Sequence, residues 1–265
     1  MPTVSDYIVK LLSYEIYAFS WEELLQNTLA PVSTLRKELS RLAKRKEILN
    51  LRKGFYLVIP PRYRVFGKLP VELYIDKLFD YANKPYYISF YSAASYYEAS
   101  HQQIQQDYIM SSAPSLRDIR KGNVKIRFFK TSKWPEKNIS QVKSDAGYYN
   151  ISSPALTFTD LVCYQAQLGG INRMLPIIEE LAEGLIPEDM ADLLSWYPIN
   201  SVLQRMGFLL EYLGLGKEHT NLIHQSLIER KFYPVLLSPG KERKAGRTGN
   251  RWKIDMNLEF DTDLT

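Results

Sequence analysis

Lys and Arg side chains are concentrated in residues 32–59, where the sequence reads VSTLRKELSRLAKRKEILNLRKGFYLVI. This stretch holds eight basic residues and two acidic ones. Cationic side chains at this density favour polyanions, because each one can neutralise a phosphate and release its counterions. The segment therefore predicts binding to nucleic acid, provided that its neighbouring elements place these side chains on one surface.

A helix is predicted to open at Ser33 and to run to about Lys46. At about 100° per residue, its leucines fall on one face and its polar and basic residues on the opposite face and its margins. Such a helix fits the major groove of DNA, and its N-terminus favours a phosphate. Together with the tip of the following hairpin, it supplies the predicted DNA-binding residues Ser33, Thr34, Arg36, Lys37, Ser40, Arg41, Lys44, Arg45, Arg52 and Lys53.

The elements around this helix predict a winged helix-turn-helix. Residues 4–13 have helical periodicity, and Ser20 with Glu23 is typical of the capping box that begins a second short helix. Lys53-Gly54 joins two β-prone runs and indicates a hairpin, the wing. The alternative is a charged face that is merely solvated, but residues 39–46 hold four basic residues and no acidic one, which favours DNA binding.

The fold class predicted from the whole sequence is α+β, with an N-terminal winged helix-turn-helix over residues 1–66 and a larger mixed α+β domain over residues 67–265. The proline-containing stretch at residues 60–70 is interpreted as a linker. Strand-like runs dominate up to about residue 152, a helical pattern continues to about residue 230, and the end returns to strand alternation.

Catalytic chemistry is not expected, and neither is a cofactor or a metal. The single cysteine, Cys163, lies in a predicted amphipathic helix, and the histidines His101, His219 and His224 lack metal-ligand spacing. One cysteine favours a reducing compartment, and neither a leader-like N-terminus nor an apolar run of about 18–20 residues is present. We therefore expect a cytoplasmic protein that is not an enzyme and has no membrane partner.

The distribution of charge along the chain separates its parts. Residues 1–68 carry a net charge of +6 and the remaining residues −1. A second basic cluster, residues 230–253, has a net charge of +7, whereas residues 69–229 sum to −4 and are expected to be a poor DNA surface. The loop within that cluster offers possible additional phosphate contacts from Lys241, Arg243, Lys244 and Arg247, with a solvated loop as the equal alternative.

A series of segments resembles one known family over nearly the whole chain. The segments are LRKGFYLVIPP, YYISFYSAASYYEA, ISSPALTFTDLVCYQAQLGGINR, QRMGFLLEYLG and the terminal RWKIDMNLEF. In this order they resemble the AbiEi-type antitoxins of bacterial abortive-infection systems. The chain departs from the family at SHQQIQQDY, where members often have Gly and Pro, so the shape of that loop is not carried over.

The resemblance implies a repressor of its own two-gene operon, a type IV antitoxin that binds inverted repeats in promoter DNA. It implies as partner a nucleotidyltransferase-like toxin, countered without a stable complex, and we expect a monomer in solution that binds DNA cooperatively. Two alternatives remain at this stage. The winged helix could be a scaffold in a protein-interaction module, or the chain could be an enzyme that acts on DNA.

Overall fold

The computed structural model describes residues 3–100, 105–239 and 244–260, and it has a mixed α+β fold. The chain forms two compact units, and each is built from discontinuous segments. Unit 1 contains Met1–Tyr87, Gln105–Ser132 and Gln141–Asn150, and unit 2 contains Ile88–Ile104, Lys133–Ser140 and Ile151–Thr265. The division into domains at residue 66 stays a prediction.

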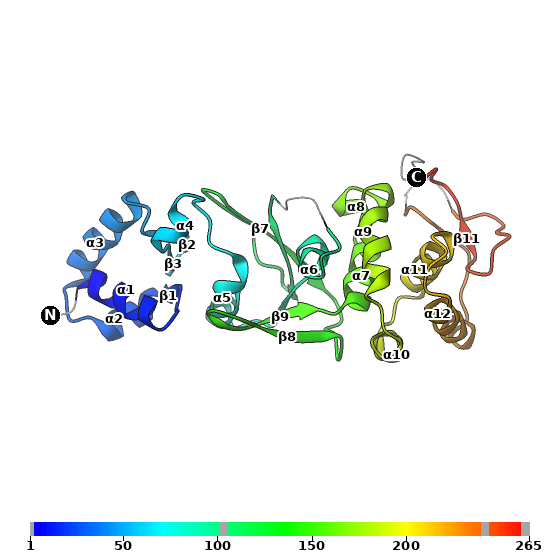
Figure 1. Cartoon of the computed structure of the whole chain (residues 1–265), viewed down its shortest axis with the longest axis horizontal. Coiled ribbons are helices and arrows are strands. Elements are labelled where there is room, and N and C mark those ends of the chain that lie inside the picture. The colour runs from blue at the N-terminus through cyan, green and yellow to red at the C-terminus, as the bar shows by residue number, and fades with distance from the viewer. Residues whose placement is uncertain (1–2, 101–104, 240–243, 261–265) are drawn as a thin grey trace. The chain divides into compact units, whose positions relative to one another are not determined.

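The first elements of unit 1 are three helices and a small antiparallel sheet. Figure 1 shows the three helices gathered around this sheet, whose strand order is β1-β3-β2. The helices and the hairpin expected from the sequence are present, whereas the short strand β1 was not expected. The elements are α1 (Val4–Ser13), β1 (Ala18–Ser20), α2 (Trp21–Asn27), α3 (Val32–Lys44), β2 (Ile48–Arg52) and β3 (Phe55–Val58).

These elements enclose a hydrophobic core of their own. The helices contribute leucines and aromatic residues, and the strands contribute Phe19, Ile48 and Val58. The predicted capping box is confirmed, because Glu23 N–H donates to Ser20 Oγ at 3.0 Å and Ser20 N–H donates to the Glu23 carboxylate at 2.6 Å. This cap begins α2 directly at the end of β1 and so fixes how the helix leaves the sheet.

The segment expected to be a linker is partly helical. Pro61 takes the first position of the short helix α4 (Pro61–Arg64), where its missing N–H is not needed. Leu69 is fully buried, so this stretch is packed rather than extended. Unit 1 continues with a 3-10 helix (Val71–Leu73), α5 (Ile75–Ala82), β5 (Asp107–Ser112), β6 (Ile119–Lys121) and β7 (Val124–Thr131).

The larger sheet has six strands in the order β6-β7-β5-β4-β9-β8. β5 pairs with β7 in parallel, and β6 forms an antiparallel hairpin with β7 in which Arg120 lies opposite Lys125. The remaining strands are β4 (Tyr86–Ile88), β8 (Ile139–Ser144) and β9 (Gly147–Ser152), and β4 pairs in parallel with β9 through Ile88 and Ile151.

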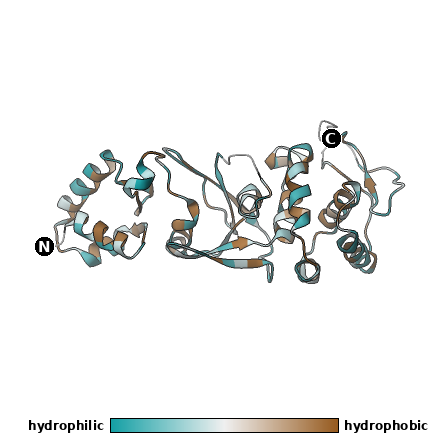
Figure 2. Cartoon of the chain, in the orientation of Figure 1, coloured by the Kyte–Doolittle hydropathy of each residue, from teal (hydrophilic) through white to brown (hydrophobic). Residues whose placement is uncertain are grey.

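Unit 2 is mainly helical, as the sequence pattern predicted. Figure 2 shows hydrophobic and hydrophilic residues interspersed along the ribbons of its helices. None of the helices in the described parts of the chain is both long and apolar enough to cross a membrane. The elements are α6 (Phe90–Tyr96), α7 (Pro154–Cys163), α8 (Gln165–Leu168), α9 (Ile171–Glu183), α10 (Pro187–Trp196), α11 (Asn200–Tyr212), α12 (Lys217–Arg230), β10 (Val235–Leu236) and β11 (Ile254–Asp255).

Two details show how unit 2 is closed. α8 ends at Leu168, and its C-cap is Gly169, whose φ of 103° is left-handed, a conformation that glycine adopts without strain. Near the end of the chain, the fully buried Trp252 donates its indole N–H to the Glu211 carboxylate of α11 at 3.0 Å. The predicted terminal strand is shorter than expected, because only Ile254–Asp255 pair as β11, in parallel with β10.

Candidate nucleic-acid interface

The helix α3 begins one residue earlier than the sequence pattern predicted. Its N-cap is Pro31, which offers no side-chain cap, and Ser33 is therefore the second helical residue rather than the first. The first turn is closed by the N–H groups of Thr34 and Leu35, which both donate to Pro31 O. The helix ends at Lys44, and Lys46 adopts a left-handed φ of 58° that turns the chain into β2.

The two faces of α3 differ as the periodicity predicted. Leu35, Leu39 and Leu42 are buried, with at most 5% of each residue exposed, and they anchor the helix in the N-terminal core. Hydrophilic and hydrophobic residues interchange along its ribbon in Figure 2. The residues of α3 predicted to contact DNA are all exposed, and so is Arg45, the C-cap of the helix. Those within α3 are Ser33, Thr34, Arg36, Lys37, Ser40, Arg41 and Lys44.

The one acidic residue of α3, Glu38, is directed away from this basic face. Its carboxylate accepts a hydrogen bond from Val4 N–H, at the first turn of α1, at 2.9 Å. An N–H group in the first turn has no partner within its own helix, so this bond satisfies it and places negative charge at the positive end of α1. On the exposed face of α3, the Arg36 guanidinium lies 5.8 Å from the centre of the Trp21 ring of α2.

Of the two hairpin residues predicted to contact DNA, one is exposed and the other is half-buried against the rest of unit 1. Lys53 is exposed at the tip, where Gly54 has a φ of 77°. Arg52 is half-buried: its guanidinium lies 5.2 Å from the Phe128 ring centre, and it donates to Arg117 O at 2.5 Å. Burial lowers the pKa of Arg52 from its usual value, and the side chain holds the hairpin to the β6–β7 region of unit 1.

The second predicted group of contacts belongs to unit 2. Lys241 and Arg243 fall outside the described residues. Lys244 and Arg247 are exposed and lie in a segment without helix or strand, as the loop prediction required. Their contact with phosphate stays a prediction.

Sequence reasoning missed the basic residues beside the wing, namely Arg117, Arg120 and Lys121. They line a cleft of about 940 Å³ together with Arg52, Lys53 and Tyr81, all within unit 1. The local signal was present in the sequence LRDIRKGNVK, but the net charge of −4 over residues 69–229 concealed it.

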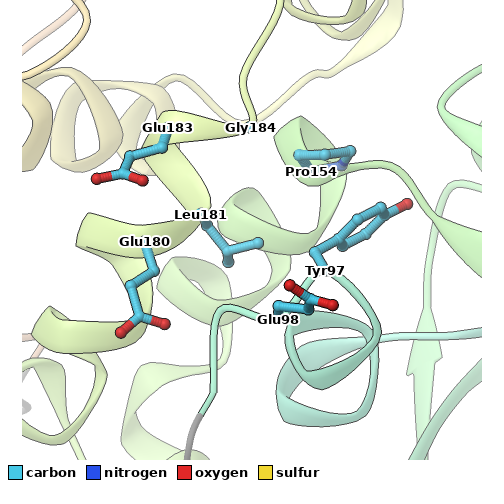
Figure 3. Close-up of a pocket in the computed structure, with 7 residues that line it drawn as sticks. All are labelled: Tyr97, Glu98, Pro154, Glu180, Leu181, Glu183 and Gly184. Carbon is cyan, nitrogen blue, oxygen red and sulfur yellow. The ribbon is translucent and has the colours of Figure 1, made fainter.

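Unit 2 contains a pocket whose charged lining residues are acidic rather than basic. It has a volume of about 470 Å³ and is bordered by Glu98, Glu180 and Glu183. Figure 3 shows Tyr97 and Glu98 across from Leu181 of α9, whose side chain points toward them. Three carboxylates repel phosphate, so this pocket does not extend a nucleic-acid surface.

Three of the residues considered for catalysis are occupied by packing, and the fourth, His101, lies outside the described residues. Cys163 is largely buried, and burial raises the pKa of its thiol to about 11, so the nucleophilic thiolate does not form at neutral pH. His219 is buried, and the His224 ring lies 5.4 Å from the Trp252 ring centre. Across residues 3–100, 105–239 and 244–260, no group of His, Cys, Asp or Glu side chains is placed to hold a metal ion.

The fold and these surfaces define a two-unit α+β protein whose N-terminal helix bundle exposes a row of basic and hydroxyl side chains. Its fold is similar to that of the RV2827C protein from Mycobacterium tuberculosis, with a TM-score of 0.64 over 94% of this chain and 89% of that chain at 15% identity. At this identity the likeness concerns the fold alone. No curated protein sequence is significantly similar to the chain.

A second solved structure is an antigenic nucleotidyltransferase-like protein from Paracoccidioides brasiliensis. It covers 59% of this chain and 85% of its own at 10% identity, and its TM-score of 0.28 is too low to support an argument. Residues 87–212 match the family model described as AbiEi antitoxin C-terminal domain. This match confirms the resemblance to the AbiEi antitoxins noted in the sequence, over residues 87–212.

Proposed function

We propose that the N-terminal elements are a winged helix-turn-helix and that the protein is a DNA-binding repressor of its own operon. The observation that carries this proposal is the asymmetry of α3. Three leucines fix one side of the helix in the core, seven polar or basic residues are exposed on the rest, and its one acidic residue accepts a hydrogen bond from Val4 N–H. In this hypothesis α2 and α3 are the two helices of the motif, and β2 with β3 is the wing.

In this hypothesis α3 enters the major groove with Ser33 and Thr34 near a phosphate. Arg36 and Arg41 can each donate in a fork to a base edge or to the backbone, whereas Lys37 and Lys44 act mainly as charges toward phosphate. The Trp21 ring that faces Arg36 restricts this side chain before DNA arrives, which lowers the entropy lost on binding. Lys53 extends the contact from the wing to the flanking backbone.

The direct test is a titration of the protein against the DNA upstream of its own gene at several salt concentrations. We expect binding to inverted repeats in that DNA, with log K falling linearly as log salt rises, by about 0.9 per phosphate neutralised. A duplex with both repeats scrambled is the control. Binding that is absent, or that ignores both salt and repeats, would contradict the proposal.

We further propose that the protein acts in the cytoplasm as a type IV antitoxin. Its match to the AbiEi antitoxin family over residues 87–212 supports a toxin as the partner. The resemblance extends this to a nucleotidyltransferase-like toxin that is countered without a stable complex, by a protein that is monomeric in solution and cooperative on DNA.

Co-expression with the product of the neighbouring gene tests this second proposal. We expect the neighbour alone to arrest growth and this protein to restore growth, while affinity purification of this protein does not retain the neighbour. A stable complex would instead favour the protein-interaction hypothesis. Growth that is not restored would contradict the antitoxin role while leaving the DNA-binding test intact.

A further inference from the structure

A group of ionisable side chains lies inside unit 1, where the segment that follows α4 meets the start of β5. Its members are Lys68, Glu72, Tyr74 and Asp107. Tyr74 is 1% exposed and Asp107 is 8% exposed, while Lys68 and Glu72 are half-buried. Burial of ionised groups costs free energy unless their charges are paired, so the balance of charge in this group is informative.

The negative charges of the group outnumber the positive ones. Lys68 Nζ lies 3.1 Å from Asp107 Oδ2 and 3.4 Å from Asp107 Oδ1, so these two residues form an ion pair. The Glu72 carboxylate forms no ion pair with a basic side chain of residues 3–100, 105–239 and 244–260. When all three groups are ionised, one carboxylate is therefore left without a counter-charge.

The neighbouring strands do not supply the missing positive charge. Across β7, the residue paired with Asp107 is the apolar Ile126. The turn between β8 and β9 brings Asp145, which adds a further negative charge beside Glu72 and is itself paired with Arg62 at 3.4 Å. Among the described residues, Lys68 is thus the cation that acts on Glu72.

These surroundings affect both carboxyl groups in the same direction. Burial raises the pKa of Asp107 above its usual value, against the lowering effect of Lys68. Burial also raises the pKa of Glu72, and the negative charge of Asp107 adds to this effect. Folding therefore favours the protonated form of the pair relative to the unfolded chain.

We propose that Glu72 and Asp107 form a proton-binding site that makes the stability of unit 1 respond to acidification. One proton taken up by the pair leaves a single carboxylate, which Lys68 balances. The hydroxyl of Tyr74 is available to the protonated carboxyl group, because it has no hydrogen-bond partner among the described residues. The protonated site holds the segment of the 3-10 helix (Val71–Leu73) to β5 more strongly than the ionised site does.

Linkage gives the direction and size of the effect. Because the folded pKa is the higher one, the stabilisation is complete below the ordinary carboxyl pKa of about 4 and is lost as the pH rises through the folded pKa. Within this window, one bound proton changes the unfolding constant by up to about tenfold per pH unit. The site therefore makes the folded protein more stable at mildly acidic pH than at neutral pH.

The first test is an NMR titration of the side-chain carboxyl carbons in the full-length wild type, from about pH 3 to pH 8. Spectra of Glu72→Gln and Asp107→Asn assign the two signals. We expect at least one of the two groups to titrate about one pH unit or more above its ordinary value. If both titrate at or below their ordinary values, the proton-binding site is refuted.

The second test is urea denaturation at several pH values, with Glu72→Gln compared to Glu179→Gln on the exposed surface of α9. Glu72→Gln should flatten the pH dependence and should unfold at a higher urea concentration than the wild type at about pH 8, because no uncompensated carboxylate remains. Glu179→Gln should follow the wild type at every pH. Asp76, whose pKa is also raised by burial, is present in all three proteins, so its contribution cancels.

The remaining outcomes separate a proton site from a structural role. A Glu72→Gln variant that is less stable than the wild type by the same factor at every pH would overturn the inference. Asp145→Asn should keep the wild-type pH dependence, and if this variant rather than Glu72→Gln abolishes it, the proton is bound elsewhere and the inference fails. If Glu72→Gln does not fold, the titration of the wild type decides, with Asp107→Asn as the assigning variant.

Discussion

Gly207 of α11 lies directly against the indole ring of Trp252. A Cβ atom at position 207 would be 2.1 Å from Trp252 Cζ3, closer than any two such atoms approach. The contact joins two segments on which the family resemblance rests, QRMGFLLEYLG and RWKIDMNLEF. The glycine is thus required by close packing of a buried ring, because its own backbone is helical.

Gly207→Ala should therefore destabilise unit 2. The ring is fully buried and its N–H is bound to Glu211, so it cannot move aside without loss of that bond. We expect a loss of about 3 kcal/mol in the free energy of unfolding, measured by urea denaturation. Gly249→Ala is the control, because a Cβ there would meet nothing within 4 Å, and equal stability of the two variants would refute the packing argument.

Arg41→Ala should weaken operator binding by about tenfold, as expected for one lost contact to DNA. Glu179→Ala, on the exposed surface of α9 in unit 2, should leave the affinity unchanged. Anisotropy titrations at one fixed salt concentration compare the two. Equal losses would remove Arg41 from the proposed interface.

Glu38→Ala should lower the free energy of unfolding by about 1–2 kcal/mol, because Val4 N–H loses a charged acceptor at the start of α1. Glu38→Gln keeps an acceptor oxygen and should lose less. Thermal melts at one pH measure both variants. If the alanine variant is as stable as the glutamine variant, the bond to Val4 does not hold α1 to α3.

The thiol of Cys163 should react slowly in the folded protein. Burial raises its pKa to about 11, from a reference value of 9.0, so at pH 8 the folded thiol is protonated far more completely than the unfolded one. We expect a disulfide reagent to modify it at least tenfold more slowly in native protein than in urea. Native and unfolded rates that agree would contradict the burial.

The same shift links stability to alkaline pH. A raised folded pKa contributes stability that is complete below pH 9 and is lost as the pH rises toward 11. Cys163→Ala should flatten the fall in unfolding free energy between pH 9 and pH 11. An unchanged slope in this variant would assign the fall to the buried tyrosines instead.

Local chemistry explains which features could be predicted from the sequence. The leucines of α3 and the capping box of Ser20 depend on residues within four positions, so periodicity and capping rules locate them. β1 has only three residues, Ala18–Ser20, too few for a strand pattern to be recognised. The start of α3 was not located from the sequence because its N-cap, Pro31, makes no side-chain cap hydrogen bond, so capping rules do not identify it.

The site was less predictable where it depends on distant residues. Arg52 was expected at an exposed tip, yet its partner ring, Phe128, lies 76 positions later in the chain. Nothing in the local sequence around Arg52 indicates that ring. The basic residues of β6 were missed for a different reason. The net charge was summed over a long segment, and such a sum conceals a short basic cluster within it.

The discontinuous make-up of unit 1 has a consequence for protein synthesis. Its last segment ends at Asn150, so the wing emerges from the ribosome well before Phe128 and Arg117, the partners of Arg52. A nascent chain stalled near residue 87 would contain the complete hairpin but expose Arg52, without its later partners, to chaperones and proteases. Fragments that end there should consequently be poor substitutes for the whole polypeptide in biochemical assays.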